Sequence, residues 1–229
     1  MSGARILAAP KPSAGRTAAI VAGLLVALLA VAVLADRAGA GTGVDHRVLH
    51  WFIDQRRDWL TPLMLTVSQA SSRLAVAVAA LAAAALAWWR RRSVRPAVLI
   101  VATCGGAGLV GLGIKHLVGA ARPPAAAQLV AKTGPAFPSG HVTYALALMG
   151  ILAVLVGGRA ARAACAALTA TITVAAVAIA VSRLYLGVHW LTDVLGGALL
   201  ATAAVLLGAW VHRMGRGGQT GHRAGVARG

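Results

Sequence analysis

Long, unbroken apolar runs limit what this chain can fold into more than any other feature of its sequence. A helix needs about 20 apolar residues to cross the hydrocarbon core of a bilayer. Six runs approach that length, at residues 17–35, 74–89, 97–114, 142–156, 163–181 and 194–211. The sequence therefore predicts an all-α, polytopic membrane protein with six transmembrane helices.

The net charge of +17 indicates membrane orientation and not nucleic-acid binding, because the basic residues sit between the apolar runs and not along one face. Lys and Arg concentrate in cytoplasmic loops of membrane proteins. Both tails, the second connection and the fourth connection contain basic residues and no acidic ones. All five acidic residues fall on the other side, at Asp36, Asp45, Asp54, Asp58 and Asp193. We therefore expect a multi-pass protein of the cell membrane with both termini in the cytoplasm.

A single transmembrane domain is predicted over residues 17–213, without internal repeats. The flanking stretches 1–16 and 214–229 are basic and poor in apolar residues, and we expect both to be disordered tails. The first apolar run is longer than the core of a typical signal peptide, which favours a retained helix over a cleaved one. Cys104 and Cys165 each fall within an apolar run, which indicates small buried side chains and not a disulfide or a metal site.

Residues 45–65 interleave aromatic and aliphatic residues with charged ones. This pattern suits a helix that lies in the outer membrane interface, with Trp51 and Trp59 at the level of the lipid headgroups. A folded cap over the functional site is the alternative, and the pattern favours the interfacial helix.

Three polar clusters interrupt the second half of the chain, each at the end of an apolar run. The first is Lys115 with Arg122-Pro123, the second is Pro138-Ser139-Gly140-His141, and the third is Ser182-Arg183 with His189 and Asp193. Alternation of the spans brings all three clusters to one face of the membrane, which the charge distribution predicts to be the outer face. We therefore expect one active site at the outer membrane–water interface.

Each cluster has a simpler interpretation when it is taken alone. Lys115 and Arg122 could be interfacial anchors, Ser139 could be a helix N-cap, and the third cluster could hold an incidental helical pair. Together, however, the clusters have the composition of a phosphate site. Lys115, Arg122 and Arg183 supply positive charge. The start of the helix after Ser139 offers backbone N–H groups, and Gly140 leaves them accessible to an anion.

His189 and Asp193 lie one helical turn apart, so their side chains can touch. A carboxylate that accepts from one imidazole nitrogen fixes the tautomer and makes the other nitrogen a nucleophile. His141 is the remaining group that can protonate a leaving oxygen. No metal or cofactor is expected, because only Asp193 lies near the clusters and a two-metal phosphatase needs several carboxylates.

The three clusters resemble, in order, spacing and identity, the signature motifs of the type 2 phosphatidic acid phosphatase superfamily, over residues 115–193. That superfamily includes lipid phosphate phosphatases, bacterial prenyl-diphosphate phosphatases, glucose-6-phosphatase and vanadium haloperoxidases. The resemblance implies an all-helical bundle, a phosphohistidine at His189, and His141 acting as acid and then as base. It also implies phosphate ligation by Lys115, Arg122, Ser139, Gly140 and Arg183.

The sequence thus predicts a metal-independent phosphatase that hydrolyses a phosphate monoester or diphosphate of a membrane lipid. Prenyl diphosphate, phosphatidic acid and phosphatidylglycerol phosphate all fit. A lipid phosphotransferase with the same site is the main alternative. A phospholipid transporter is disfavoured because the spans carry few polar groups, and a vanadium haloperoxidase is disfavoured because those relatives are soluble. The predicted partners are the bilayer and its lipid substrate, with the oligomeric state left open.

Overall fold

The structure, a computed structural model, describes residues 14–157 and 161–226, with the backbone alone for residues 216–226. Its elements are α1 (Ala14–Ala38), α2 (Gly43–Asp54), α3 (Leu60–Ala70), α4 (Arg73–Arg91), α5 (Arg95–Val118), the short 3-10 helix η1 (Ala125–Ala127), α6 (Gly140–Gly157), α7 (Arg162–Tyr185) and α8 (Leu191–Val226). These ranges contain no strand. The predicted all-α class is confirmed.

Six of the described helices are long and apolar enough to cross a membrane, namely α1, α4, α5, α6, α7 and the first 25 residues of α8. Each contains one of the predicted apolar runs. Such runs become helical in a bilayer because every backbone N–H and C=O group then finds its partner within the segment. The two shortest runs gain length from polar ends, since α4 begins at Arg73 and α6 begins at Gly140. The predicted six-span architecture is confirmed.

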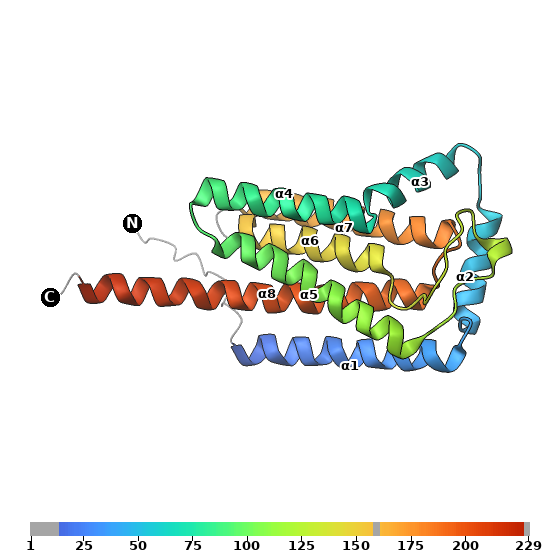
Figure 1. Cartoon of the computed structure of the whole chain (residues 1–229), viewed down its shortest axis with the longest axis horizontal. Coiled ribbons are helices and arrows are strands. Elements are labelled where there is room, and N and C mark those ends of the chain that lie inside the picture. The colour runs from blue at the N-terminus through green and yellow to red at the C-terminus, as the bar shows by residue number, and fades with distance from the viewer. Residues whose placement is uncertain (1–13, 158–160, 227–229) are drawn as a thin grey trace, which may run out of the picture.

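The spans alternate in direction, so the ends of α5 and α7 and the starts of α6 and α8 meet at one end of the bundle (Figure 1). Helix α8 packs against α1, α5 and α6. Glycines allow close approach along these contacts. A Cβ added to Gly150 would lie 2.6 Å from the Val205 side chain, and one on Gly208 would lie 2.7 Å from Thr103. Small residues permit this packing of membrane helices, which fixes the helix ends relative to one another.

The segment between α1 and α4 forms two helices, where the sequence predicts a single interfacial helix over residues 45–65. Helix α2 ends at Asp54 and α3 begins at Leu60. Pro62 has no backbone N–H to donate, so it suits the first turn of a new helix and not the interior of a continuous one. Helix α2 lies across the ends of the spans (Figure 1).

The two faces of α2 have different surroundings. On the inner face, Leu49 is 6% exposed and packs against Ala136 and Trp190 in the loops that precede α6 and α8. On the outer face, Trp51 is 58% exposed, and Trp59 just before α3 is 74% exposed. The segment therefore covers the loops, as the cap alternative predicts, while its tryptophans stay available for the headgroup region.

The backbone of α8 stays helical to Val226, although the sequence predicts a disordered tail from residue 214. No proline follows Pro138 in the sequence, so no residue after the last span blocks the helical hydrogen-bond ladder. The predicted N-terminal tail, residues 1–16, is described only from Ala14, where α1 begins. Residues 1–13 lie outside the described part of the chain.

Candidate active site

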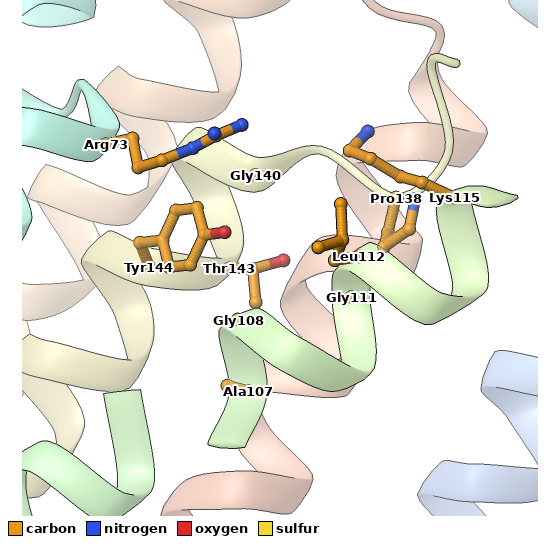
Figure 2. A pocket seen from close by; sticks show the side chains of 10 residues that line it. All are labelled: Arg73, Ala107, Gly108, Gly111, Leu112, Lys115, Pro138, Gly140, Thr143 and Tyr144. Carbon is orange, nitrogen blue, oxygen red and sulfur yellow. The ribbon is translucent and has the colours of Figure 1, made fainter. Parts of the chain in front are cut away.

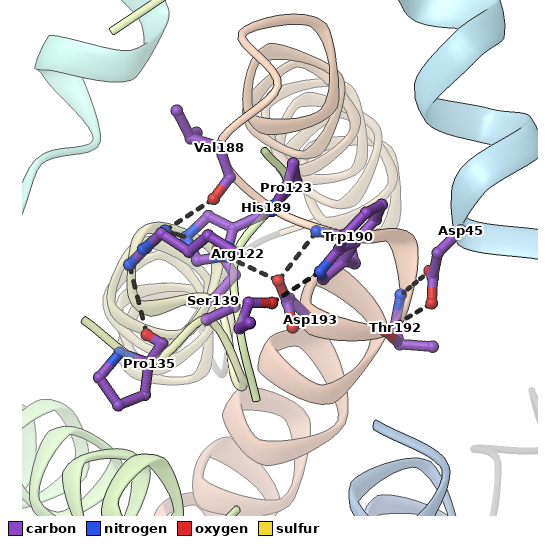
Figure 3. A network of polar contacts seen from close by, with 12 residues as sticks. Asp45, Arg122, Pro123, Pro135, Ser139, Val188, His189, Trp190, Thr192 and Asp193 are labelled. Carbon is purple, nitrogen blue, oxygen red and sulfur yellow. Dashed lines mark hydrogen bonds and ion pairs between the residues drawn. The ribbon is translucent and has the colours of Figure 1, made fainter. Parts of the chain in front are cut away.

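All of the residues predicted to carry the chemistry lie at the same end of the bundle. Figure 3 shows Arg122, Ser139, His189 and Asp193 near one another. Lys115 lies in the last turn of α5, and Arg122 and Ser139 lie in the loop that follows. Gly140 and His141 begin α6, and Arg183 lies in the last turn of α7. His189 precedes α8, which holds Asp193 in its first turn. The structure therefore brings the three sequence clusters together, from segments that are far apart along the chain.

His189 and Asp193 form a buried pair, with side chains 3% and 0% exposed. His189 Nδ1 lies 3.0 Å from Asp193 Oδ2, and the backbone N–H of Trp190 donates to the same oxygen at 2.8 Å. On the other side of the ring, Nε2 lies 3.2 Å from Arg122 Nη1. Because a guanidinium only donates, Nε2 accepts and Nδ1 carries the proton. The lone pair of His189 is therefore on Nε2, directed at a cation.

The surroundings of His189 favour its neutral form. Burial lowers its pKa well below the usual 6.5, and the positive charges of Arg122, Arg183 and Lys115 lower it further. A neutral imidazole keeps Nε2 unprotonated at physiological pH. The same positive charges would attract an anionic substrate, so the electrostatics of the site favour both a nucleophilic histidine and a bound phosphate.

Arg122 joins the loop before α6 to the loop before α8. Its Nε donates to the carbonyl oxygens of Thr133 and Gly134 at 3.3 and 3.1 Å, and its Nη1 donates to the carbonyl oxygen of Val188 at 2.7 Å. These contacts direct the guanidinium into the protein. The simpler interpretation of Arg122 as an anchor in the headgroup region is therefore wrong for this side chain.

Lys115 holds the segment that leads into α6. Its Nζ donates to the carbonyl oxygens of Pro135 and Ala136 at 3.0 and 2.9 Å. An ammonium group has three donors, so one N–H remains for an anion. Lys115 also lines the same pocket as Gly140. It therefore positions the loop and places a positive charge at the start of α6.

Three buried side-chain atoms have no hydrogen-bond partner among the described residues, and all three belong to the predicted site: Ser139 Oγ, Arg183 Nε and Asp193 Oδ1. Buried polar groups are nearly always paired in folded proteins. Ser139 Oγ and Arg183 Nε are donors, so both lack an acceptor that a phosphate oxygen would supply. The unpaired hydroxyl also shows that Ser139 does not cap α6 with its side chain, so that simpler interpretation is wrong.

Arg183 is 1% exposed, at the end of α7. Its Nη1 donates to the hydroxyl of Ser68 in α3. The one ion pair within the described ranges is His189–Asp193, so no carboxylate pairs with the buried guanidinium there. A buried charge without a counter-ion is costly, and binding of an anion would relieve that cost.

Comparison with known proteins decides the family. The family model of the PAP2 superfamily matches residues 96–216, which is more than half of the chain. The chain belongs to the PAP2 superfamily. The resemblance predicted from the three motifs is thereby confirmed.

The solved structures with a similar fold include the following two. A transmembrane PAP2-type phosphatidylglycerolphosphate phosphatase from Bacillus subtilis matches with a TM-score of 0.76 and 22% identity, over 85% of this chain and 96% of that chain. LpxE from Aquifex aeolicus matches with a TM-score of 0.59 and 19% identity, over 73% of this chain and 95% of that chain. At these identities the likeness establishes the fold. A comparison with curated protein sequences found no match.

Asp45 lies beside the candidate site, although the sequence alone used it only to indicate which side of the membrane is outside. It is 1% exposed, and its carboxylate accepts from Thr42 at the start of α2. It also accepts from the backbone N–H and hydroxyl of Thr192 at 2.9 and 3.1 Å, which fixes α2 to the first turn of α8 beside Asp193. In the sequence, the Thr42-x-x-Asp45 spacing, which is that of a capping box, could have indicated that Asp45 has a structural role at the start of a helix.

Proposed function

We propose that this chain is a metal-independent phosphatase that removes a phosphate group from a membrane lipid through a phosphohistidine at His189. The enzyme class, a phosphoric ester hydrolase, follows from membership of the PAP2 superfamily. The observation that supports the mechanism is the placement of His189, whose Nδ1 lies 3.0 Å from Asp193 Oδ2 while Nε2 lies 3.2 Å from Arg122 Nη1; a carboxylate and a guanidinium in these positions favour the tautomer with the proton on Nδ1. A nucleophilic histidine requires this arrangement.

In the first step, His189 Nε2 attacks the phosphorus, so that a P–N bond forms while the P–O bond to the lipid breaks. Asp193 stabilises the positive charge that develops on the imidazole. His141, in the first turn of α6, donates a proton to the leaving oxygen. In the second step, His141 accepts a proton from a water that attacks the phosphohistidine. The P–N bond breaks as the new P–O bond forms, so inorganic phosphate leaves and His189 is restored.

The free donors of the site hold the phosphate during both steps. These are the third N–H of Lys115, the Nε–H of Arg183 and the hydroxyl of Ser139. Arg122 donates to Nε2 in the substrate-free site, and we expect the same N–H to turn to a phosphate oxygen once the phosphorus approaches Nε2. The transition state spreads negative charge over three equatorial oxygens, which these donors stabilise.

An apolar groove beside the site supports a lipid as the substrate. It has a volume of about 350 Å³ and is lined by residues of α3, α4, α6 and α7. Its lining includes Ala145, one turn after His141, and Val67, the neighbour of the Ser68 that bonds Arg183. A lipid tail in this groove would place its headgroup at the site. Prenyl diphosphates, phosphatidic acid and phosphatidylglycerol phosphate all combine an apolar tail with a phosphate headgroup. The Bacillus subtilis neighbour is a phosphatidylglycerolphosphate phosphatase.

Purified protein should release inorganic phosphate from at least one of these lipids, and the release should survive EDTA. Within the described ranges, no group of three or more His, Cys, Asp or Glu side chains is arranged to hold a metal. Vanadate should inhibit, because it can adopt the five-coordinate geometry of the transition state at His189. A colorimetric phosphate assay across the lipid panel in detergent micelles, with and without EDTA, measures both effects.

A metal-dependent alkaline phosphatase, chelated in parallel, shows that the EDTA treatment works. Complete loss of activity on chelation, restored by Mg²⁺ or Zn²⁺, would contradict the metal-independent mechanism. Transfer of phosphate to a second lipid in place of its release would identify a phosphotransferase. Lipid movement between vesicle leaflets without any turnover would identify a transporter.

We further propose that the protein resides in the cell membrane with both termini in the cytoplasm and the site outside. The connection between α4 and α5, at the end opposite the site, carries Arg90, Arg91, Arg92 and Arg95 and no acidic residue. Such connections stay on the cytoplasmic side. The site end instead carries the acidic residues that the sequence analysis assigned to the outside.

Cysteine labelling in intact cells tests this orientation. In a chain with Cys104→Ala and Cys165→Ala, a cysteine at Ala126 in η1 should react with an impermeant thiol reagent, and one at Val94 should not. Ala126 is exposed at the site end, and Val94 is 60% exposed at the other end. Both should react in permeabilised cells, which is the control. Labelling of Val94→Cys alone in intact cells would reverse the proposed topology.

A further inference from the structure

The connection between α7 and α8 carries His189 and is held by segments that lie far away in the sequence. Lys115 and Gly140 are placed differently, because they belong to α5 and α6, which pack against each other and line the pocket in Figure 2. The connection instead depends on individual hydrogen bonds. One of them runs from Arg122 to the carbonyl oxygen of Val188 (Figure 3). The position of His189 therefore depends on what else holds the residues just before it.

Arg56, between α2 and α3, binds this region although it lies outside the three motifs. Its Nε and Nη2 donate to the carbonyl oxygen of Tyr185 at 3.2 and 3.1 Å, and Nη2 also donates to the carbonyl oxygen of Ala127 at 2.6 Å. Tyr185 ends α7, and Ala127 ends η1 in the loop before α6. One guanidinium thus joins three segments, since its two partners are 129 and 71 residues away along the chain.

Gly187 allows these segments to approach each other. It lies just after the end of α7 with a φ of 66°, in the left-handed region that favours glycine. A Cβ added there would overlap the carbonyl oxygen of Ala127 and would lie 2.9 Å from Arg56 Nη2. A side chain at this position would therefore displace the guanidinium or separate the connection from the loop before α6.

The side chain of Tyr185 makes the reciprocal contact. The residue is 1% exposed. Its hydroxyl accepts from the backbone N–H of Arg57 at 2.9 Å and donates to the carbonyl oxygen of Arg57 at 3.1 Å. The Arg56 side chain therefore holds the backbone of Tyr185, while the Tyr185 side chain holds the backbone beside Arg56. We call this pair of contacts the Arg56–Tyr185 clamp.

A simpler interpretation is that Arg56 only caps α7, because basic side chains often bind the free carbonyl groups at the end of a helix. That accounts for the bonds to Tyr185 but not for the bond to Ala127, which lies outside α7. The bond to Ala127 fixes the end of α7 to the loop that carries Arg122 and Ser139. The clamp therefore joins the segment of the nucleophile to a segment of the phosphate site.

The clamp also differs from Arg122 in what it does during the reaction. In the proposed mechanism, an N–H group of Arg122 turns from His189 to the phosphate when the substrate binds. The partners of the Arg56 guanidinium are backbone carbonyl oxygens, and none of them touches the substrate. The clamp can therefore keep its contacts through both steps.

We propose that Arg56 is a positioning residue for this reaction. It holds the connection between α7 and α8 against the loop before α6, so that His189 Nε2 stays in line with a phosphate that the other segments bind. This inference rests on the proposed function. Misplacement of a reacting group by about 1 Å can cost a factor of about 10² in rate. Because Arg56 does not bind the phosphate, its loss should affect kcat and not KM.

Steady-state kinetics in detergent micelles test the proposal, with the lipid of the panel that the wild type hydrolyses fastest. Arg56→Met removes the donors but keeps an unbranched side chain, and it should lower kcat about 10- to 100-fold with KM within about threefold of wild type. Arg56→Lys should lose less, because an ammonium group can still donate to a carbonyl oxygen but lacks the planar fork that spans two of them.

Arg57→Met is the matched control. Arg57 is the exposed neighbour of Arg56, and its guanidinium donates only to the carbonyl oxygens of Asp54 and Arg56. Its contacts with Tyr185 use the backbone alone, so they survive the substitution. Arg57→Met should therefore leave both kcat and KM unchanged.

Chemical rescue separates positioning from a general loss of stability. Millimolar guanidinium chloride should restore part of the kcat of Arg56→Ala, whereas the same concentration of sodium chloride should not. Tyr185→Phe should also lower kcat. The double variant Arg56→Met with Tyr185→Phe should lose less than the product of the two single losses, because both changes open the same clamp.

Size-exclusion profiles and melting temperatures in detergent report whether each variant is folded at the assay temperature. A folded Arg56→Met protein whose kcat lies within about threefold of wild type, or whose loss appears only in KM, would overturn the proposal. If Arg56→Met does not fold, Arg56→Lys and Tyr185→Phe decide, and a wild-type kcat in both would overturn it. An inactive wild-type protein, or a phosphoenzyme at a residue other than His189, would instead contradict the proposed function.

Discussion

Replacing His189 with alanine should abolish turnover, with a loss in kcat of about 10⁴ or more, the scale seen when a covalent hydrolase loses its nucleophile. The reason is the unique position of Nε2, whose lone pair is fixed by the bond from Nδ1 to Asp193 and faces the cations of the site. Rapid quenching of wild-type protein with a ³²P-labelled lipid should trap an acid-labile, base-stable phosphoenzyme. The variant should yield none.

His50→Ala is the matched control, because His50 is an exposed histidine on α2 at the same end of the bundle. It should keep full activity and the same phosphoenzyme level. Size-exclusion profiles and melting temperatures of the two variants in detergent would show that the His189 effect is not a folding defect. A phosphoenzyme that mapped to a different residue, or that persisted in His189→Ala, would overturn the assignment of the nucleophile.

The six spans could be predicted from sequence because hydrophobic length alone determines them. Six runs near 20 residues have no other stable form in a bilayer than helices. The meeting of the three clusters could also be predicted, since each lies at a span end and the spans alternate. The pairing of His189 with Asp193 follows from their helical spacing. In each case, the prediction depends either on residues that are close together in the sequence or on the alternating direction of the spans.

The contacts of the cations could not be predicted in the same way. Lys115 and Arg122 donate most of their N–H groups to backbone carbonyl oxygens, in the loop before α6 and at Val188. The loop conformation determines which carbonyl oxygens these side chains can reach. No periodic pattern in the sequence predicts that conformation. The partner of Arg183 is Ser68, which is 115 residues away along the chain. Such long-range pairs depend on how α3 packs on α7.

The region before α4 shows how tertiary contacts determine the structure of an ambiguous segment. Its mixture of apolar and charged residues is compatible with an interfacial helix or with a cap, since both need one apolar and one polar face. Asp45 decides the arrangement by bonding Thr192, which is 147 residues away. No local sequence pattern predicts that contact, which places α2 over the loops of the site.

Asp193→Asn should lower kcat by a factor on the order of 10² or more while leaving KM nearly unchanged. A comparable Asp-to-Asn change in a serine protease triad costs about 10⁴ in kcat. Asp193 is 0% exposed and contacts the imidazole of His189, so its charge acts when His189 becomes cationic in the transition state. The amide keeps the shape of the carboxylate but removes that charge, and it can present an N–H to Nδ1, which favours the wrong tautomer.

Two variants and a stability measurement separate this role from a structural one. Arg183→Ala should raise KM along with any fall in kcat, because a phosphate ligand acts in the ground state as well as in the transition state. Asp58→Asn, an exposed acidic residue at the same end, should change neither constant.

Asp193 also accepts from the backbone N–H of Trp190 at 2.8 Å in the first turn of α8, so Asp193→Asn should also lower the melting temperature in detergent. A capping role alone would show as that thermal destabilisation with kcat near the wild-type value. Only the loss of charge beside His189 predicts a fall in kcat for protein that remains folded at the assay temperature. Steady-state kinetics well below the melting transition therefore decide between the two roles, and a kcat near wild type would leave Asp193 as a cap of α8.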